Sequence, residues 1–201
     1  MSPVIGVLAI QGDVREHVHC LEQSGAQVRL VKTVEQFQGI AGLVIPGGES
    51  TTMSILAVKN NLLEPLRELR TKIPMYGSCA GLIMLADHIT DGRSDQETIG
   101  GLHITARRNA FGRQVDSFEI DLAIPEIGAP DYHAIFIRAP LVESAADDVE
   151  VLAAIPAANS LTNSDQIVAV RQDNILATSF HPEITSDLRI HEHFVEMVRS
   201  A

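Results

Sequence analysis

Cysteine is scarce in this sequence, which has only Cys20 and Cys79. Two cysteines cannot build the disulfide framework of a small secreted domain, so we expect both thiols to be free and the chain to work in the reducing cytoplasm. Cys79 nevertheless stands in a distinctive setting, between the glycines of Gly77-Ser78-Cys79-Ala80-Gly81. That setting raises the question of what the thiol does.

Basic residues are also few: 15 Lys plus Arg stand against 26 Asp plus Glu, which gives a net charge of −11. Nucleic acids and anionic membranes both bind to basic surfaces, so we expect neither as a partner. No apolar run approaches the roughly 18 residues that a membrane-spanning helix needs. The first apolar run, in MSPVIGVLAIQGD, has no basic segment before it and leads into a polar glycine turn. We interpret it as a strand rather than a signal peptide.

The chain has 201 residues, of which 45% are hydrophobic, and this is enough to bury a full core. Its first half alternates apolar runs at 4–10, 28–31 and 42–48 with helical patterns. Asp13 is a candidate cap for the first helix, which ends at Gly25, and the helix at 51–70 is interrupted near Asn60-Asn61. Strands that alternate with helices predict a parallel sheet. We predict a single domain over 1–201.

The second half consists mostly of short β-like runs, at 101–107, 117–124, 133–139, 149–155, 166–172 and 175–180. They indicate an antiparallel addition together with late strands of the main sheet, and 153–165 is interpreted as a surface loop. A helix at 187–199 ends the chain. The predicted fold class is α/β with three layers: a mostly parallel central sheet, helices on both of its faces, and an antiparallel addition.

Gly77-x-Cys79-x-Gly81 has the spacing of a nucleophile elbow, in which the chain turns sharply from a strand into a helix. A Cβ atom two residues before or after the nucleophile would crowd such a turn, which explains the glycines. Cys79 would then stand at a helix N-terminus, where backbone amides favour the thiolate. The same pattern also fits an inert buried cysteine between two packing glycines.

A cysteine nucleophile needs a base, and His181 in SFHPEIT is the candidate. In an extended chain His181 and Glu183 point to the same face, so Glu183 could accept the imidazole N–H and orient the ring. A plain turn after a strand is the alternative. We assign no role to the other histidines, His17, His19, His88, His103, His133, His191 and His193, because none has a comparable context.

The third candidate is IPGGEST, Ile45–Thr51, where a strand ends at two glycines before a helix. Successive backbone amides at such a junction can bind an oxyanion, although a plain turn or a phosphate-binding loop is an alternative; the glycine–lysine pattern of that loop is missing. All three candidates follow presumed parallel strands, and together they predict cysteine-based acyl transfer. No cysteine–histidine cluster has metal-ligand spacing, so we predict no metal and no cofactor.

Six blocks carry a resemblance to a known family: 6–17 (GVLAIQGDVREH), 42–53 (GLVIPGGESTTM), 76–85 (YGSCAGLIML), 108–119 (RNAFGRQVDSFE), 136–140 (FIRAP) and 179–183 (SFHPE). With them the chain resembles the class I glutamine amidotransferases, and within that family the glutaminase subunits of pyridoxal phosphate synthase. The blocks run from the first strand to near the last helix. Ser78 stands where threonine is commoner, and segments 125–132 and 153–165 look longer than usual.

The resemblance implies that Cys79 is the nucleophile, His181 the base and Glu183 its orienter. It also implies that L-glutamine is bound by Gly47, Gly48, Glu49, Arg108, Ile137 and Arg138, and that the amides of Gly47, Gly48 and Ala80 form the oxyanion site. An arginine such as Arg108 suits the α-carboxylate of a free amino acid. Gln11 is expected near the interface with a synthase subunit, in a large hetero-oligomer.

The resemblance therefore implies hydrolysis of L-glutamine to L-glutamate and ammonia, with the ammonia passed to the synthase subunit for pyridoxal phosphate synthesis. One rival is a redox-sensing or stress-related protein of similar fold, in which Cys79 is oxidised rather than acylated. It does not account for the HPE segment or the paired glycines. A second rival is a non-catalytic module that regulates a partner, and the intact triad speaks against it.

Overall fold

The computed structural model describes residues 2–108, 117–159 and 164–201. The strands are β1 Val4–Leu8, β2 Gln27–Val31, β3 Gly42–Ile45, β4 Met75–Ser78, β5 Ala86–Thr90, β6 Leu102–Arg107, β7 Ser117–Leu122, β8 Tyr132–Ile137, β9 Leu141–Ala145, β10 Glu150–Ile155, β11 Gln166–Gln172 and β12 Ile175–Thr178. The α-helices are α1 Val14–Gln23, α2 Ser50–Lys59, α3 Leu63–Leu69, α4 Ala80–Leu85 and α5 Arg189–Ser200. Short 3-10 turns are η1 Val34–Phe37, η2 Pro125–Ile127, η3 Ala157–Asn159 and η4 Pro182–Ile184.

The main sheet has the strand order β2-β1-β3-β4-β12-β11-β9-β6-β5, and β10 pairs with β11 beside this path. The first five strands in this order are parallel to one another. Every residue of β3, β4 and β12 is buried, as expected of parallel strands that are covered on both faces. The carboxyl ends of β1, β3, β4 and β12 therefore meet at one edge of the sheet.

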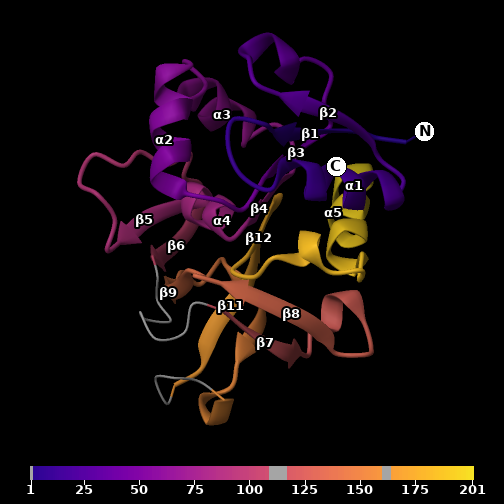
Figure 1. The fold of residues 1–201 in the computed structure, drawn as a ribbon, viewed down its shortest axis with the longest axis vertical. Coiled ribbons are helices and arrows are strands. Elements are labelled where there is room, and N and C mark those ends of the chain that lie inside the picture. Colours follow the sequence, from indigo (N-terminus) through magenta and orange to yellow (C-terminus); the bar gives the residue numbers. More distant parts are fainter. Residues whose placement is uncertain (1, 109–116, 160–163) are drawn as a thin grey trace.

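Helices cover both faces of the parallel strands, as Figure 1 shows with α2 and α3 on one side and α1 and α5 on the other. One core cluster joins the sheet to the apolar faces of α2, α3 and α4. A second cluster joins it to α1 and α5. The predicted three-layer α/β class is confirmed. No helix in the described part of the chain is long and apolar enough to cross a membrane.

Most predicted elements of the first half are present, including the interruption near Asn60-Asn61, where α2 ends and α3 begins. Two strands were not predicted: β5, which directly follows the short helix α4, and β9. The interpretation of 153–165 as a surface loop is wrong at its start, because Ala153, Ala154 and Ile155 pair with β11. Residues 160–163 of that segment lie outside the described part.

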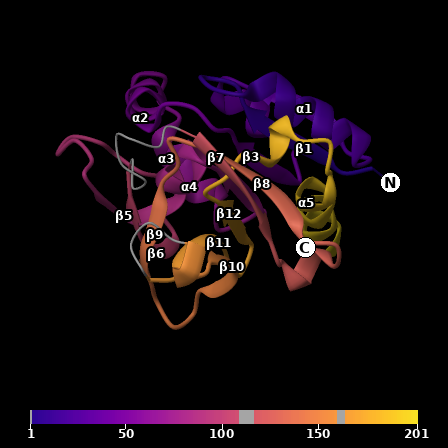
Figure 2. The ribbon, with the colours of Figure 1, turned by 60° about the horizontal axis from the view of Figure 1, so that its bottom comes forward.

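β7 and β8 form a separate antiparallel hairpin. The rings of Phe118 and Phe136 stack on it with centroids 4.5 Å apart, and Phe136 meets Phe180 edge to face at 5.6 Å. The hairpin extends from the neighbourhood of β12 towards α5 (Figure 2). Because the backbone N–H of His181 donates to the carbonyl of Ile135 in β8 at 2.9 Å, the hairpin also fixes the segment after β12.

Candidate active site

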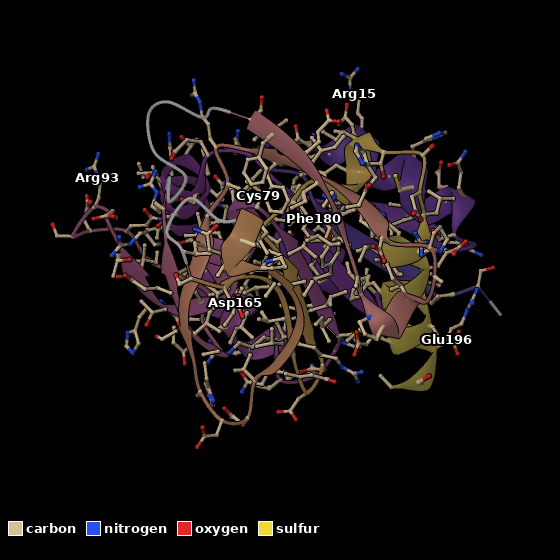
Figure 3. The ribbon with its side chains drawn as sticks, turned by 90° about the horizontal axis from the view of Figure 1, so that it is seen from below. Arg15, Cys79, Arg93, Asp165, Phe180 and Glu196 are labelled. Atoms are coloured by element: carbon tan, nitrogen blue, oxygen red, sulfur yellow. The ribbon has the colours of Figure 1, made fainter. Side chains whose placement is uncertain are left out.

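The candidate catalytic residues meet at the edge where the parallel strands end. Cys79 follows β4, the Gly47-Gly48 pair follows β3, and His181 follows β12. Seen from below, Cys79 and Phe180 lie near the middle of the molecule, whereas Arg15, Arg93 and Glu196 project at its rim (Figure 3). A cavity of about 580 Å³ opens here and is lined by Gln11, Asp13, Gly48, Glu49, Ser50, Cys79, Ala80, Ile83, Arg108, Ile137, Arg138, Pro140, His181 and Ile184.

Cys79 has the strained backbone expected of an elbow, with φ 48° and ψ −103° between β4 and α4. A Cβ atom on Gly77 would lie 2.5 Å from the backbone of Gly81, and one on Gly81 would lie 2.1 Å from the carbonyl oxygen of Ile45. Neither contact can be relieved by a side-chain movement, because backbone atoms are involved. The two glycines therefore allow the turn that presents the Cys79 thiol to the cavity.

His181 and Glu183 form a close, buried pair, in which Nδ1 of His181 donates to Oε1 of Glu183 at 2.7 Å. The sequence predicted this pairing on the assumption that the segment is extended, and that assumption is wrong. Pro182–Ile184 is a 3-10 turn, and His181 occupies the position before it with φ −107° and ψ 85°. The turn brings the carboxylate of Glu183 back to the imidazole ring of His181.

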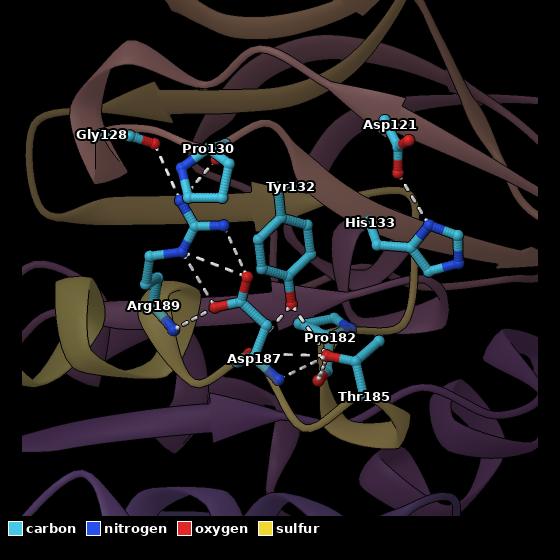
Figure 4. Close-up of polar contacts among 9 residues, drawn as sticks. All are labelled: Asp121, Gly128, Pro130, Tyr132, His133, Pro182, Thr185, Asp187 and Arg189. Carbon is cyan, nitrogen blue, oxygen red and sulfur yellow. Dashed lines mark hydrogen bonds and ion pairs between the residues drawn. The ribbon is translucent and has the colours of Figure 1, made fainter.

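Interactions beyond the 3-10 turn hold this segment in place (Figure 4). The hydroxyl of Thr185 donates to the carbonyl of Pro182 at 3.1 Å and lies 3.2 Å from the hydroxyl of Tyr132 in β8. Arg189 donates to Asp187 and, at 2.7 Å, to the carbonyl of Pro130. The residues that follow Glu183 are thus fastened to the β7–β8 hairpin and its loop.

The electrostatics of the pair favour an imidazolium. Burial alone lowers the pKa of His181, but favourable interactions with Cys79 and Glu183 outweigh burial and raise this pKa to about 10. Burial raises the pKa of the Glu183 carboxyl, and the hydrogen bond from His181 opposes that rise. A positive ring between a sulfur and a carboxylate is the arrangement in which a thiolate–imidazolium pair is stabilised.

The two-glycine turn rests on the loop between β1 and α1. The carbonyl of Gly47 accepts the amide of Asp13 at 3.1 Å, and the side-chain carbonyl of Gln11 accepts the amide of Glu49 at 2.9 Å. Gly48 has φ 146°, and a Cβ atom there would lie 2.4 Å from Gln11. Gln11, expected at an interface, is thus in direct contact with the turn.

Glu49 and Arg108 form an ion pair beside the cavity, with Nη2 of Arg108 2.8 Å from Oε1 of Glu49. The other carboxylate oxygen of Glu49 caps α2 by accepting the amide of Thr52 at 2.7 Å. Burial works against the ionised Glu49 carboxyl, but the Thr52 bonds and Arg108 outweigh it and lower its pKa. Of the block that contains Arg108, residues 109–116 lie outside the described part.

Ile137 and Arg138 close the cavity opposite the elbow. The sulfur of Cys79 lies 4.0 Å from the carbonyl oxygen of Ile137. Arg138 has φ 45°, a conformation that non-glycine residues seldom adopt and that often marks a functional site. All the residues assigned from the sequence to the triad and to glutamine thus lie in or beside one cavity.

Three residues near the triad, Asp13, His17 and Ser78, were not assigned to the active site from the sequence. Asp13 directly precedes α1, but its side chain makes no cap bond; instead Oδ2 lies 3.6 Å from Nδ1 of His181. His17 and Ser78 lie behind Glu183 and are completely buried. The spacing of His17 among the apolar residues of α1 places this residue on the buried face of the helix. Its neighbours in α5 and η4 come from distant parts of the chain, so the structure is needed to identify them.

Asp13, His181 and Glu183 have ligand-type atoms within 4.8 Å of one another, the one such group of three found among the described residues. A cation bound to Nδ1 of His181 would break the 2.7 Å hydrogen bond to Glu183. The chemistry of a cysteine triad depends on that bond, so the arrangement suits proton transfer rather than metal binding.

Comparison with known proteins gives matches over nearly the whole chain. A model of the SNO glutamine amidotransferase family matches residues 7–200. A protein of Kineococcus radiotolerans named pyridoxal 5'-phosphate synthase subunit PdxT is 56% identical, with 98% of this chain and 96% of that protein covered. A protein of the same name from Mycobacteroides abscessus is 55% identical, with 100% of both chains covered.

Solved structures are similar as well. A crystal structure of a glutamine amidotransferase has a TM-score of 0.86 and 41% sequence identity, and covers 97% of this chain and 98% of that one. The structure of PurLQS from Thermotoga maritima has a TM-score of 0.65 at 16% identity, covering 100% of this chain and 97% of that one. This second likeness concerns the fold alone.

Proposed function

Because this chain belongs to the SNO glutamine amidotransferase family, we propose that it hydrolyses the side-chain amide of L-glutamine through Cys79, His181 and Glu183 and supplies the ammonia to a pyridoxal 5'-phosphate synthase subunit. The proposal is carried by one observation: Cys79 and His181 line the same cavity, and His181 is hydrogen-bonded at 2.7 Å to the buried Glu183. The glutaminase activity follows from the family, and the residue roles are our assignment.

In the first half-reaction the Cys79 thiolate attacks the amide carbon of glutamine. The negative charge that develops on the amide oxygen is bound by backbone amides of the Gly47-Gly48 turn and of Ala80, which follows Cys79. Removal of one such donor typically costs about a hundred- to a thousandfold in turnover. The imidazolium of His181 gives its proton to the departing nitrogen, so ammonia leaves and a glutamyl thioester remains on Cys79.

In the second half-reaction His181, now neutral, takes a proton from water as the hydroxide adds to the thioester carbon. Collapse of this adduct breaks the carbon–sulfur bond, releases L-glutamate and restores the thiolate–imidazolium pair. Glu183 keeps the ring in one orientation and stabilises its positive charge through the 2.7 Å hydrogen bond. The chemistry uses only groups of the chain and water.

The ion pair of Glu49 and Arg108 offers a site for the other end of glutamine. A free amino acid carries an α-carboxylate and an α-ammonium group, which complement an arginine and a glutamate respectively. Arg108, whose side chain is only 17% exposed, would bind the carboxylate, and Glu49 the ammonium group. The backbone of Ile137 and Arg138 and the Gly47-Gly48 turn complete the enclosure.

Gln11 links this site to a partner. Its side chain supports the Gly48-Glu49 backbone directly, so a synthase subunit that docks against Gln11 would act on the oxyanion site. Glycine peptides reorient easily, and one flipped peptide would replace a donor by a carbonyl that repels the oxyanion. We therefore assign to Gln11 the coupling between docking in a hetero-oligomer and activity.

The experiment that tests the proposal is glutamate release from L-glutamine by the purified chain, alone and with the synthase subunit of the same organism. We expect the chain alone to turn over slowly. The synthase subunit should raise kcat by up to about a thousandfold, because that is the typical effect of one oxyanion donor on turnover. Gln11→Ala should lower the rise, whereas Val34→Ala, at an exposed site outside the cavity lining, should not. Absence of glutamate release under both conditions would contradict the function.

A further inference from the structure

A buried polar network lies behind Glu183, on the side away from His181. Nδ1 of His17 in α1 lies 3.0 Å from Nε2 of His191 in α5, and Nε2 of His17 lies 2.9 Å from Oγ of Ser78 in β4. The same Nε2 atom is 3.5 Å from Oε2 of Glu183. All three of these side chains, His17, His191 and Ser78, are inaccessible to solvent.

The hydrogen-bond partners decide which nitrogen of each ring carries the proton. Nδ1 of His191 is buried without a hydrogen-bond partner. A proton there would be a buried, unsatisfied donor, so the proton of His191 lies on Nε2 and is donated to Nδ1 of His17. His17 then accepts at Nδ1 and carries its own proton on Nε2.

The opposite arrangement is unfavourable at both ends. It would bury the unpaired N–H of His191, and it would turn the lone pair of His17 Nε2 towards the carboxylate of Glu183. With the proton on Nε2, His17 instead donates to Oγ of Ser78 at 2.9 Å, and the same polar N–H edge lies 3.5 Å from Oε2 of Glu183. That oxygen is buried and accepts no hydrogen bond, since Oε1 is the atom that takes the bond from His181.

We propose that His17 is a positioning residue of the triad: its neutral ring, held in the Nε2–H tautomer by His191 and Ser78, turns its polar N–H edge towards Glu183 Oε2, 3.5 Å away, and stabilises that buried carboxylate electrostatically. The proposal deepens the glutaminase function and rests on it. With His17, the row of interacting residues that contains Cys79, His181 and Glu183 continues to the interface between α1 and α5.

The electrostatic surroundings agree with a neutral donor. Burial, with further contributions from His191 and His181, lowers the pKa of His17 well below its usual value. A positively charged His17 would compete with His181 for the negative charge of Glu183, whereas a neutral N–H supports the carboxylate without that competition. The titratable groups that face Glu183 or His17 are Asp13, Cys20, Tyr76, Tyr132, His181 and His191.

The first test compares His17→Leu and His17→Gln in the complex with the synthase subunit. His17→Leu removes the polar N–H edge, and the lost electrostatic support of the Glu183 carboxylate should lower kcat about tenfold with little change in KM. The Glu183 carboxyl should also become easier to protonate, so the acid limb of the kcat–pH profile should move to higher pH. His17→Gln, which keeps an N–H donor, should restore most of both properties.

His19→Leu is the matched control, because His19 lies on the same helix but is exposed. Wild-type kcat and an unchanged acid limb in His17→Leu would overturn the proposal. Equal losses of kcat in His17→Leu and His17→Gln, with the acid limb of the kcat–pH profile unchanged, would also overturn the proposal, because they would indicate that His17 has only a packing role. If the wild type releases no glutamate, the proposed function fails instead.

The second test needs no variant and no activity. Nitrogen-15 NMR of the wild-type chain at neutral pH distinguishes the two neutral tautomers of each histidine. We expect both His17 and His191 to be neutral with the proton on Nε2. A proton on Nδ1 of His17, or a charged His17, would overturn the proposal even if His17→Leu did not fold.

Discussion

The buried histidine His191 should make the chain sensitive to mild acid. Burial lowers the pKa of His191 to about 4, compared with about 6.5 for an unfolded histidine. Between these values the unfolded state binds more protons than the native state, so the free energy of unfolding falls as the pH is lowered from 6.5 towards 4. Above pH 6.5 both states are neutral at this residue, and its contribution is constant.

The size of the effect follows from the two pKa values. Linkage from pH 7 to pH 4.5 gives a loss of about 2.5 kcal/mol from His191 alone, a large part of the stability of an ordinary domain. His17 acts in the same direction, because its pKa is lowered as well. His181 acts in the opposite sense: its pKa of about 10 contributes stability below pH 6.5 that is lost as the pH rises to 10.

Urea unfolding at pH 7 and pH 4.5, for the wild type and for His191→Leu, measures the effect. The variant should lose about 2.5 kcal/mol less than the wild type over this range, whatever its absolute stability. His193→Leu is the comparison on the same helix, since the ring of His193 is only partly buried. The same pH dependence in the wild type and in His191→Leu would refute the reasoning.

Three further predictions concern the site. Glu183→Gln should lower turnover less than His181→Ala, although loss of the orienter in a related triad costs on the order of ten-thousandfold; wild-type turnover in Glu183→Gln would make this residue structural. Arg108→Ala should raise the KM for glutamine more than it lowers kcat, and steady-state kinetics with an unchanged KM would remove Arg108 from the substrate site. Gly81→Ala should destabilise the fold in a thermal melt, because its Cβ would lie 2.1 Å from the carbonyl oxygen of Ile45, and an unchanged melting temperature would show that the elbow tolerates a side chain.

The parts of the site that the sequence predicted are those set by local sterics. The two glycines around Cys79 are needed because a strand turns into a helix within a few residues, and this requirement is visible in the spacing alone. The glycines after β3 and the segment after β12 likewise follow runs of buried strand residues. The family resemblance, confirmed by the SNO match, added Arg108, which nothing in its local pattern distinguishes from a surface residue.

The parts that the sequence did not predict depend on contacts between distant elements. His17, Ser78 and His191 come from α1, β4 and α5, and no local pattern brings them together. Asp13 was expected to cap α1, but tertiary structure turns its carboxylate towards His181 instead. The β5 strand was missed because the apolar run after Cys79 ends at its first residue, Ala86, and the residues that follow include Asp87 and His88, so no apolar pattern marks the strand.

Cys20 provides an internal control for the chemistry of Cys79. Burial, with the nearby charge of Glu183, raises the pKa of Cys20 to about 11, so its thiol stays protonated at neutral pH and is a poor nucleophile. Its sulfur donates to the backbone carbonyl of Glu183 at 3.7 Å and is buried. Of the two cysteines, only Cys79 lines the cavity.

The Cys79 sulfur should carry the glutamyl group during turnover, and rapid quenching in acid followed by peptide mass spectrometry detects such an adduct. When the complex is quenched while it turns over L-glutamine, we expect a glutamyl thioester on the peptide that contains Cys79. Cys79→Ala should lack the adduct and release no glutamate, while Cys20→Ala should match the wild type. Glutamate release by Cys79→Ala, or an adduct on Cys20, would contradict the claim.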